Sequence, residues 1–269
     1  NFQHYLTRKS VPTLPKDYSK EEWEKMRSSY VRALLTRGLG VYSESGVNPL
    51  QLGIISSTDN HAATGGFVDE DKWLGSVFGI GDLDKAMVRK SWNPGGLVAV
   101  WAEENTRHSL FDALKRREVY ATSGPRMQVR LQGSKKALSC NAYDYEGIPM
   151  GGSFKKLQNA PYFRIEAAYD EIPLQSIEII KGEFRDGELM ETIIPVWQKT
   201  KGGLHICMTW ADPDFDLKAP AFWYVRVLEV PTLRWSAHHC RREGRCDEFP
   251  GAETTLQERA WTSPIWYLP

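Results

Sequence analysis

Two patterns of apolar and polar positions divide the chain near residue 125. In the first part, short apolar runs at residues 52–56, 96–101 and 119–122 lie between turn signals and predict buried strands. Polar segments follow these runs, and a helix is predicted from about residue 106 to 117. The order strand, polar loop, helix, strand is typical of a parallel α/β sheet or barrel.

Two amphipathic helices are predicted in this first part. The earlier one begins at a capping box, in which Ser19 accepts from first-turn amides while Glu22 reaches back. Gly38 and Gly40 are expected to end or bend it. Apolar residues at steps of three and four give each helix one inward face: Trp23, Met26, Tyr30 and Leu34 on the first, and Leu110, Phe111 and Leu114 on the second.

After residue 125 the pattern changes to alternation with a period of two. Five such runs, separated by turn signals, predict strands, and no convincing helix lies between them: 127–131, 162–167, 176–181, 203–208 and 222–228. Residues 261–267 predict a closing strand. We therefore expect two domains, residues 1–125 with an α/β fold and residues 126–269 forming a β-rich, antiparallel sandwich-like domain.

Composition narrows the classes of function. The 34 Lys and Arg residues balance 34 Asp and Glu residues, which argues against a nucleic-acid binder or an acidic-membrane binder that works through bulk charge. No apolar run approaches the roughly 18 residues that a membrane-spanning helix needs. With 269 residues, of which 41% are apolar, the chain can bury a core without disulfides or a metal.

Four cysteines stand at 140, 207, 240 and 246, too few for a disulfide-built scaffold. Cys240 and Cys246 flank five residues and could form a disulfide between them. Free thiols are equally compatible with the spacing. A zinc site with His238 and His239 is the third alternative, although this spacing matches no usual ligand set.

Asp59 and His61 are the sharpest candidates for chemistry. They follow a predicted buried strand, at the edge where parallel α/β folds build active sites. A carboxylate and an imidazole suit Zn, Mn or Fe better than Ca or Mg. On extended backbone, a two-residue offset points both side chains the same way. The alternative is a turn, with Asp59 as an Asx cap and His61 half exposed.

Polar residues also follow the second predicted strand. Glu103 and Glu104 could bind a metal or act as acid or base, and Asn105 and Arg107 complete a candidate substrate-binding set, with Arg107 holding an anionic group. The alternative is an ordinary helix N-terminus with its acids and cap. Arg126 follows a Ser-Gly-Pro turn, which either joins the domains or offers a further anion contact.

Several long strings in the chain resemble the DUF3604 family. They are ISSTDNH (55–61), NPGGL (93–97), VWAEENTR (100–107), FDALKRREVYATSGPR (111–126) and QERAWTSPIWY (257–267). The resemblance extends from Tyr30 to Tyr267. That family is similar to the PHP superfamily of metal-dependent hydrolases, which are distorted α/β barrels with two or three metals. The resemblance implies that residues 1–125 are the C-terminal strands and helices of a PHP-like distorted (β/α) barrel.

The same resemblance implies a metal centre. Asp59 and His61 would be the last PHP metal motif, both residues being ligands of Zn, Mn or Fe, and Asp59 could also orient or deprotonate a metal-bound water. The N-terminal His-x-His pair of such sites is absent here, and the α/β part contains only His4, His61 and His108. The chain, which begins with Asn1, is therefore expected to be a C-terminal portion, inactive until a missing N-terminal portion supplies the other ligands.

The sequence thus predicts part of a metal-dependent hydrolase of a small molecule. Phosphoester hydrolysis is slightly preferred, with Arg107 and Arg126 meeting an anionic substrate. One alternative is amide or lactone hydrolysis at the same metals. Another is a non-catalytic module, in which Trp and Tyr residues of the β-rich half bind a polymer or a protein.

Overall fold

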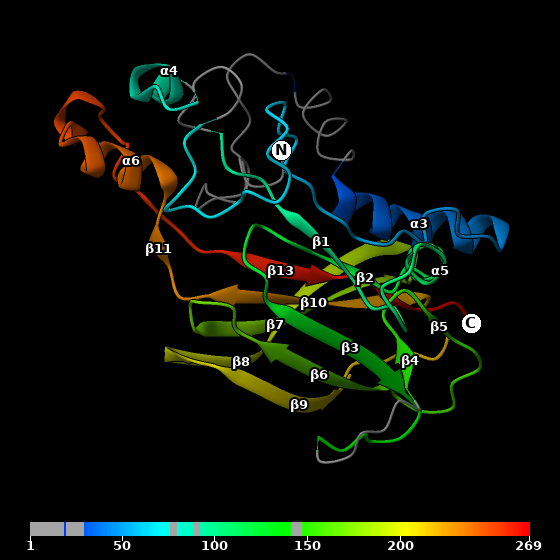
Figure 1. Cartoon of the computed structure of the whole chain (residues 1–269). Coiled ribbons are helices and arrows are strands. Elements are labelled where there is room, and N and C mark those ends of the chain that lie inside the picture. Colours follow the sequence, from blue (N-terminus) through cyan, green and yellow to red (C-terminus); the bar gives the residue numbers. More distant parts are fainter. Residues whose placement is uncertain (1–18, 20–29, 76–79, 89–91, 141–146) are drawn as a thin grey trace.

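The fold is taken from a computed structural model that describes residues 19, 30–75, 80–88, 92–140 and 147–269. The predicted capping box from Ser19 to Glu22, and the helix face at Trp23 and Met26, fall almost wholly outside these residues. Two large sheets and one small one dominate the described chain (Figure 1).

The helices lie around the sheets. They are α3 (Val31–Ser45), α4 (Leu83–Val88), α5 (Arg107–Arg116) and α6 (Trp235–Glu243), with the 3-10 turn η1 (Cys246–Glu248). None of the helices in the described ranges has the length and apolar character to cross a lipid bilayer.

The strands divide among three sheets. The eight-stranded sheet contains β1 (Leu97–Val100), β2 (Val119–Thr122), β5 (Ser153–Phe154), β7 (Leu174–Arg185), β8 (Glu188–Gly203), β10 (Ala221–Glu229), β13 (Arg259–Thr262) and β14 (Ile265–Tyr267). The four-stranded sheet has the order β4 (Ile148–Pro149), β3 (Gln128–Ser134), β6 (Tyr162–Ala168), β9 (His205–Ala211). The small sheet pairs β11 (Thr232–Leu233) with β12 (Thr255–Leu256).

Strand β10 shows why the two large sheets stack. Its side chains alternate, so that Trp223 and Val225 enter the core between the two sheets, whereas Phe222 and Tyr224 enter a second core on the opposite face. Leu39 of α3 belongs to this second core, and Figure 1 shows α3 on that side of the sheet. Both faces of β10 are therefore buried. The β-rich fold predicted from the alternation is confirmed.

The expected PHP-like (β/α) barrel is wrong. β1 and β2 pair antiparallel, and β2 pairs antiparallel with β13. A parallel sheet needs crossover helices that cover its faces, but α5 leaves Phe111 58% and Leu114 46% exposed and buries only Ala113. The inward face predicted for this helix is therefore also wrong. α5 lies in the connection between the antiparallel strands β1 and β2. Arg117, in the left-handed region with φ 62°, ends the helix.

Two further elements differ from the sequence prediction. Residues 52–56 form no strand, although Leu52 and Ile54 pack against the core beside α3. α6 interrupts the part of the chain for which no helix was predicted. Because β2 pairs with β13, strands from both sides of residue 125 share one sheet. The division into two domains at that residue stays a prediction.

Helix α3 passes through both glycines that were expected to end it. It ends instead at Gly46, which has φ 73° and donates its amide to Tyr42 O. Gly38 is required by close approach, because a Cβ there would lie 2.4 Å from Asn48 Oδ1 and 2.9 Å from Leu50 Cβ. At Gly40 the same atom would make an ordinary contact of 3.6 Å with Leu189.

The two glycines should therefore respond in opposite ways to alanine. Gly38→Ala is expected to lower the free energy of unfolding by about 1–3 kcal/mol, because the new methyl group overpacks the Asn48 contact. Gly40→Ala should raise it by about 0.5–1 kcal/mol through helix propensity. Urea unfolding of both variants measures the difference. Equal changes in the two variants would contradict this explanation of Gly38.

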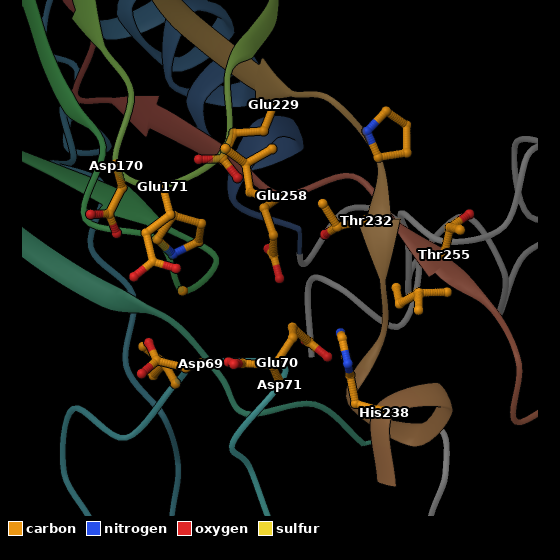
Figure 2. A pocket seen from close by; sticks show the side chains of 16 residues that line it. Asp69, Glu70, Asp71, Asp170, Glu171, Glu229, Thr232, His238, Thr255 and Glu258 are labelled. Atoms are coloured by element: carbon orange, nitrogen blue, oxygen red, sulfur yellow. The ribbon is translucent and has the colours of Figure 1, made fainter. Parts of the chain in front are cut away.

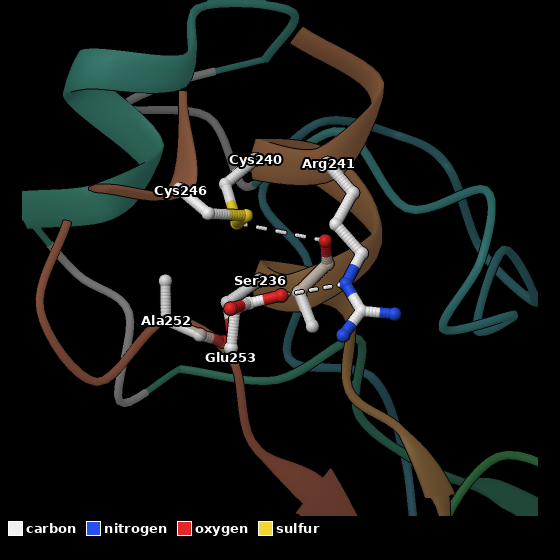
Figure 3. Close-up of a disulfide and its surroundings, with 7 residues drawn as sticks. Ser236, Cys240, Arg241, Cys246, Ala252 and Glu253 are labelled. Atoms are coloured by element: carbon white, nitrogen blue, oxygen red, sulfur yellow. Dashed lines mark hydrogen bonds and ion pairs between the residues drawn. A yellow bond between two sulfur atoms is a disulfide. The ribbon is translucent and has the colours of Figure 1, made fainter. Parts of the chain in front are cut away.

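Both cysteine pairs form disulfides. Cys240 bonds to Cys246, which decides among the three alternatives that the spacing left open, and Cys140 bonds to Cys207 of β9. Figure 3 shows the first bond at the C-terminal end of α6. On the same helix, Ser236 Oγ donates to Ala252 O (2.7 Å) and Arg241 Nε pairs with Glu253 Oε1 (2.7 Å). The segment that leads to β12 is thus fixed to α6.

Candidate functional site

An acidic pocket of about 540 Å³ lies where β10, β11 and α6 meet the loops at 68–71 and 170–172 (Figure 2). No Lys or Arg is among the described residues that line it. Its ionisable lining residues are Asp69, Glu70, Asp71, Asp170, Glu171, Glu229, His238 and Glu258. A cavity with this lining attracts cations and repels anions.

Neighbouring strand ends bring two of these glutamates together. Glu229 ends β10, and Glu258 comes directly before β13, which pairs with β10. The backbone amide of Glu229 donates to Glu258 O (2.9 Å). A register shift between β10 and β7 falls at Leu228 and Glu229. Both residues are buried where these two neighbouring strands meet the pocket.

Glu229 is a deeply buried residue of the pocket. Only 2% of the residue is exposed, and its Oε1 has no hydrogen-bond partner. Burial, together with the negative charges of Asp170 and Glu171, raises the pKa of Glu229 to about 8. The group therefore keeps its proton at neutral pH.

Glu70 and Glu258 form a second, interacting carboxyl pair. The Trp235 amide donates to Glu70 Oε2, and Ser123 Oγ donates to Glu258 Oε2. Burial raises the pKa of Glu70 to about 7, although Trp235, Arg234 and Glu258 act against the shift. Burial and the charge of Glu70 raise the pKa of Glu258 well above its usual range. Two buried carboxyl groups that interact in this way do not readily ionise together.

This arrangement of carboxyl groups is suited to proton transfer. A carboxyl group whose pKa is near 7 can take a proton in one step and give it in another at neutral pH. Glu70 is ionised above about pH 7, and Glu229 stays protonated up to about pH 8. One pocket thus holds a carboxylate base and a carboxylic acid at the same pH.

The structure places the predicted metal ligands outside this pocket. Asp59 and His61 are both exposed, and the His61 ring contacts the backbone carbonyl of Asp59 (Nδ1 to O, 2.9 Å). Asp59 has φ 49°, so the backbone is not extended there. In the part of the chain that the structure describes, no group of three or more His, Cys, Asp and Glu is arranged to hold a metal ion.

The candidate residues at the start of α5 also lie away from the pocket. Glu103, Glu104, Asn105 and Arg107 are exposed, and Thr106 caps the helix by accepting from the Ser109 amide (3.3 Å). The capping part of the prediction is confirmed. Glu103 lines a separate cavity of about 530 Å³, together with Trp101 and Arg130. A substrate-binding role for these four residues stays a prediction.

Arg126 contacts the acidic pocket from its rim. Its amide donates to Asp170 Oδ2 (2.7 Å), and its guanidinium donates to Gly66 O (3.2 Å) and lies 3.6 Å from Asp69 Oδ1. Arg126 therefore connects the two loops that carry these acids, with its backbone amide on one loop and its side chain on the other. Contact with an anionic substrate stays a prediction for this residue.

Sequence reasoning missed the three glutamates Glu70, Glu229 and Glu258 of the pocket. Glu70 and Glu258 carry no spacing that could have identified them, because they meet only in the folded chain. Glu229 does carry a signal, since it lies between Leu228 and Val230 at the end of an apolar strand. An acidic residue in such a position is buried at a cost and marks a candidate site.

Comparison with known proteins gives the family. A family described as "Protein of unknown function (DUF3604)" matches residues 9–197 and 195–269. No curated protein and no solved structure matches the chain. Because the two matched segments together extend from residue 9 to the last residue, the chain belongs to the DUF3604 family.

Proposed function

We propose that the protein is a hydrolase whose proton transfers take place in the acidic pocket. The observation that carries the proposal is the buried carboxyl group of Glu229, whose Oε1 has no hydrogen-bond partner, beside the Glu70–Glu258 pair. Glu70 takes a proton from the attacking water as the new bond between oxygen and carbon forms. Glu229 gives a proton to the leaving group as the scissile bond breaks. Ser123 and the Trp235 amide hold the pair in place.

The charge of the pocket bears on the substrate class. The acidic residues of the pocket that are ionised repel a phosphoester, and no Lys or Arg is among the described lining residues to offset them. This bears against the phosphoester that was slightly preferred from the sequence. A carboxylate ester, an amide or a lactone brings no such charge. We therefore place amide, ester or lactone hydrolysis before phosphoester hydrolysis for this pocket.

Metal dependence is a separate part of the proposal. The resemblance to the PHP superfamily supports Asp59 and His61 as ligands of Zn, Mn or Fe. The described residues do not by themselves fit such a centre, because these two side chains are exposed and no third ligand is grouped with them. Two or three metal ions there would need ligands from other parts of the protein. The proton transfers above involve no metal.

Hydrolysis assays on the full-length protein test the proposal. Chromogenic carboxylate esters, anilides, lactones and phosphoesters are compared, and kcat/KM is followed from pH 5 to pH 10. We expect turnover of a carbonyl substrate, with limbs near pH 7 and pH 8 set by Glu70 and Glu229. Glu229→Gln should lower kcat by about 10²- to 10⁴-fold and remove the alkaline limb.

Two control variants make the assay specific. Glu188→Gln removes an exposed carboxylate at the start of β8, opposite Arg185 at the end of β7, and should leave kcat unchanged. Asp59→Asn, with elemental analysis of the same preparation, tests the metal part. Activity that survives Glu229→Gln but is lost with the metal on Asp59→Asn would contradict the pocket and leave the metal centre as the site. A folded protein that hydrolyses nothing would favour a non-catalytic binding module.

A further inference from the structure

We propose that the acidic pocket binds an organic cation that carries a primary ammonium or guanidinium group on an aliphatic body. The inference rests on the proposed function only for its location. It concerns what the pocket holds, and binding can be measured without turnover.

The need for a cation follows from Glu229. Its carboxyl group is buried, lines the pocket and has no hydrogen-bond partner at Oε1. Figure 2 shows Asp170, Glu171 and Glu258 around it. A buried polar atom that lacks a partner costs free energy, which a ligand N–H donor removes. Because acidic neighbours surround this carboxyl group, a positively charged donor is the ligand that they favour.

The size and walls of the pocket favour an organic cation over a bare metal ion. About 540 Å³ is room for a small molecule, and no described group of three or more ligands converges on one point. Apolar residues also form part of the wall, and they would contact a hydrocarbon body. They are Val68, Pro125, Ile172, Pro231 and Leu233.

The lining also selects the type of cation. Quaternary ammonium groups are usually held by the faces of Trp, Tyr and Phe, and the described lining of this pocket contains none of these residues. Carboxylates bind instead through N–H donors, most strongly when the donor is charged. The hydroxyl groups of Thr232 and Thr255 offer further acceptors. A ligand with several N–H groups therefore fits, whereas a methylated one does not.

Binding should release a proton. Glu229 holds one at neutral pH, and a cation beside it favours the ionised form. The other groups that titrate or carry charge around it are Asp69, Glu70, Asp71, Asp170, Glu171, His238 and Glu258 in the lining, with Arg126, Arg234 and Arg259 next to them. Affinity should therefore rise between pH 6 and pH 8.

Isothermal titration calorimetry with agmatine tests the inference, because agmatine carries a guanidinium and an ammonium on a four-carbon chain. The full-length protein is titrated at pH 7.5 in two buffers of different ionisation enthalpy. We expect saturable binding with release of up to one proton. Glu229→Gln should weaken binding about tenfold or more and abolish the release. Glu188→Gln should change neither, and choline should bind about tenfold more weakly than agmatine.

Each opposite result overturns the inference. Equal affinities for choline and agmatine would show that the pocket does not recognise N–H donors. Equal effects of Glu229→Gln and Glu188→Gln on agmatine affinity would show that the negative charges of the protein attract the cation nonspecifically. Binding of Mn²⁺ or Ca²⁺ without binding of agmatine would make the pocket a metal site. Circular dichroism confirms that each variant is folded. If agmatine fails to bind while Glu229→Gln still abolishes ester hydrolysis, the inference falls and the proposed function stands. If agmatine binds but Glu229→Gln leaves hydrolysis unchanged, the inference stands and the proposed function falls.

Discussion

Glutamine at position 229 is expected to raise the free energy of unfolding at pH 8.5 by roughly 3–5 kcal/mol, while it removes hydrolysis. In the folded protein Glu229 keeps its proton up to about pH 8, whereas an ordinary Glu loses it near 4.5. Between these values the folded state binds one proton more than the unfolded state. Stability therefore falls by about 1.4 kcal/mol for each pH unit in this window. Glutamine has no proton to lose, so it avoids the fall.

Urea unfolding at pH 4.5, 6, 7 and 8.5 measures this effect. The free energy of unfolding of the wild-type protein should fall as the pH rises. That of Glu229→Gln should fall less steeply, because the titration of this one group no longer contributes. Near pH 4.5 the two proteins should differ by only about 0.4 kcal/mol, because Glu229 is then protonated in the folded state and about half ionised in the unfolded state. Glu188→Gln removes a carboxylate from the surface and should follow the wild type. Parallel curves for the wild type and Glu229→Gln would contradict the raised pKa.

A substitution that stabilises the fold and removes activity has a clear meaning. Most substitutions at buried positions destabilise a protein, because they disturb packing. A buried carboxyl group that costs stability is retained where function needs it. Higher stability together with lost hydrolysis in Glu229→Gln would therefore show that Glu229 has a functional role. A group of acidic residues without a function would not lose activity on this substitution.

Lys181→Met is expected to have the largest destabilising effect, a loss of about 3–5 kcal/mol in the free energy of unfolding. Lys181 lies on β7 and is only 3% exposed. Its ammonium group is 2.9 Å from Asp212 Oδ2 and 3.2 Å from Glu183 Oε2, and it donates to Asp214 O (2.7 Å). Asp212 also accepts from Trp223 Nε1 (3.0 Å). Removing the ammonium leaves two buried carboxylates without this cation.

Thermal and urea unfolding of Lys181→Met give the size of this loss. Lys85→Met is the matched control, because Lys85 forms an ion pair of similar length with Asp82 (3.0 Å) but its side chain is 70% exposed. Exposed pairs of this kind contribute little to stability. Equal behaviour of the two variants would contradict a stabilising role for the buried network around Lys181.

Much of the β-rich half could be predicted from local pattern. The alternation at 222–228 predicted a strand, and β10 buries both of its faces in the way that its apolar residues require. The helix cap expected at residues 105–106 was likewise a local feature, and the structure places it at Thr106. Such features depend on neighbouring residues in the chain, so the sequence alone carries them.

The sheet partners could not be predicted in the same way. Val119–Thr122 has the apolar character of a strand, but nothing in it says that Ala121 lies opposite Trp261. Pairing over this separation depends on how the whole core packs. The order strand, helix, strand therefore suggested a parallel sheet, whereas α5 in fact connects β1 and β2, which pair antiparallel.

The candidate site shows the same limit more strongly. Asp59 and His61 stand two residues apart and were easy to identify, and the structure leaves them exposed on a loop. The pocket glutamates come from positions 70, 229 and 258 and become a site only when β10 and β13 pair and α6 packs beside them. Their effect on each other depends on burial, which no spacing in the chain reveals.

The most direct test of the account is a pH titration of glutamate side chains by NMR, with ¹³C at the carboxyl carbon. The central claim is that buried carboxyl groups in this pocket hold protons at neutral pH. We expect one resonance to titrate near pH 7 and to vanish in Glu70→Gln, and another to titrate near pH 8 and to vanish in Glu229→Gln. If every glutamate instead titrates below about pH 5, as exposed groups do, the pocket holds no such acid and the account is wrong.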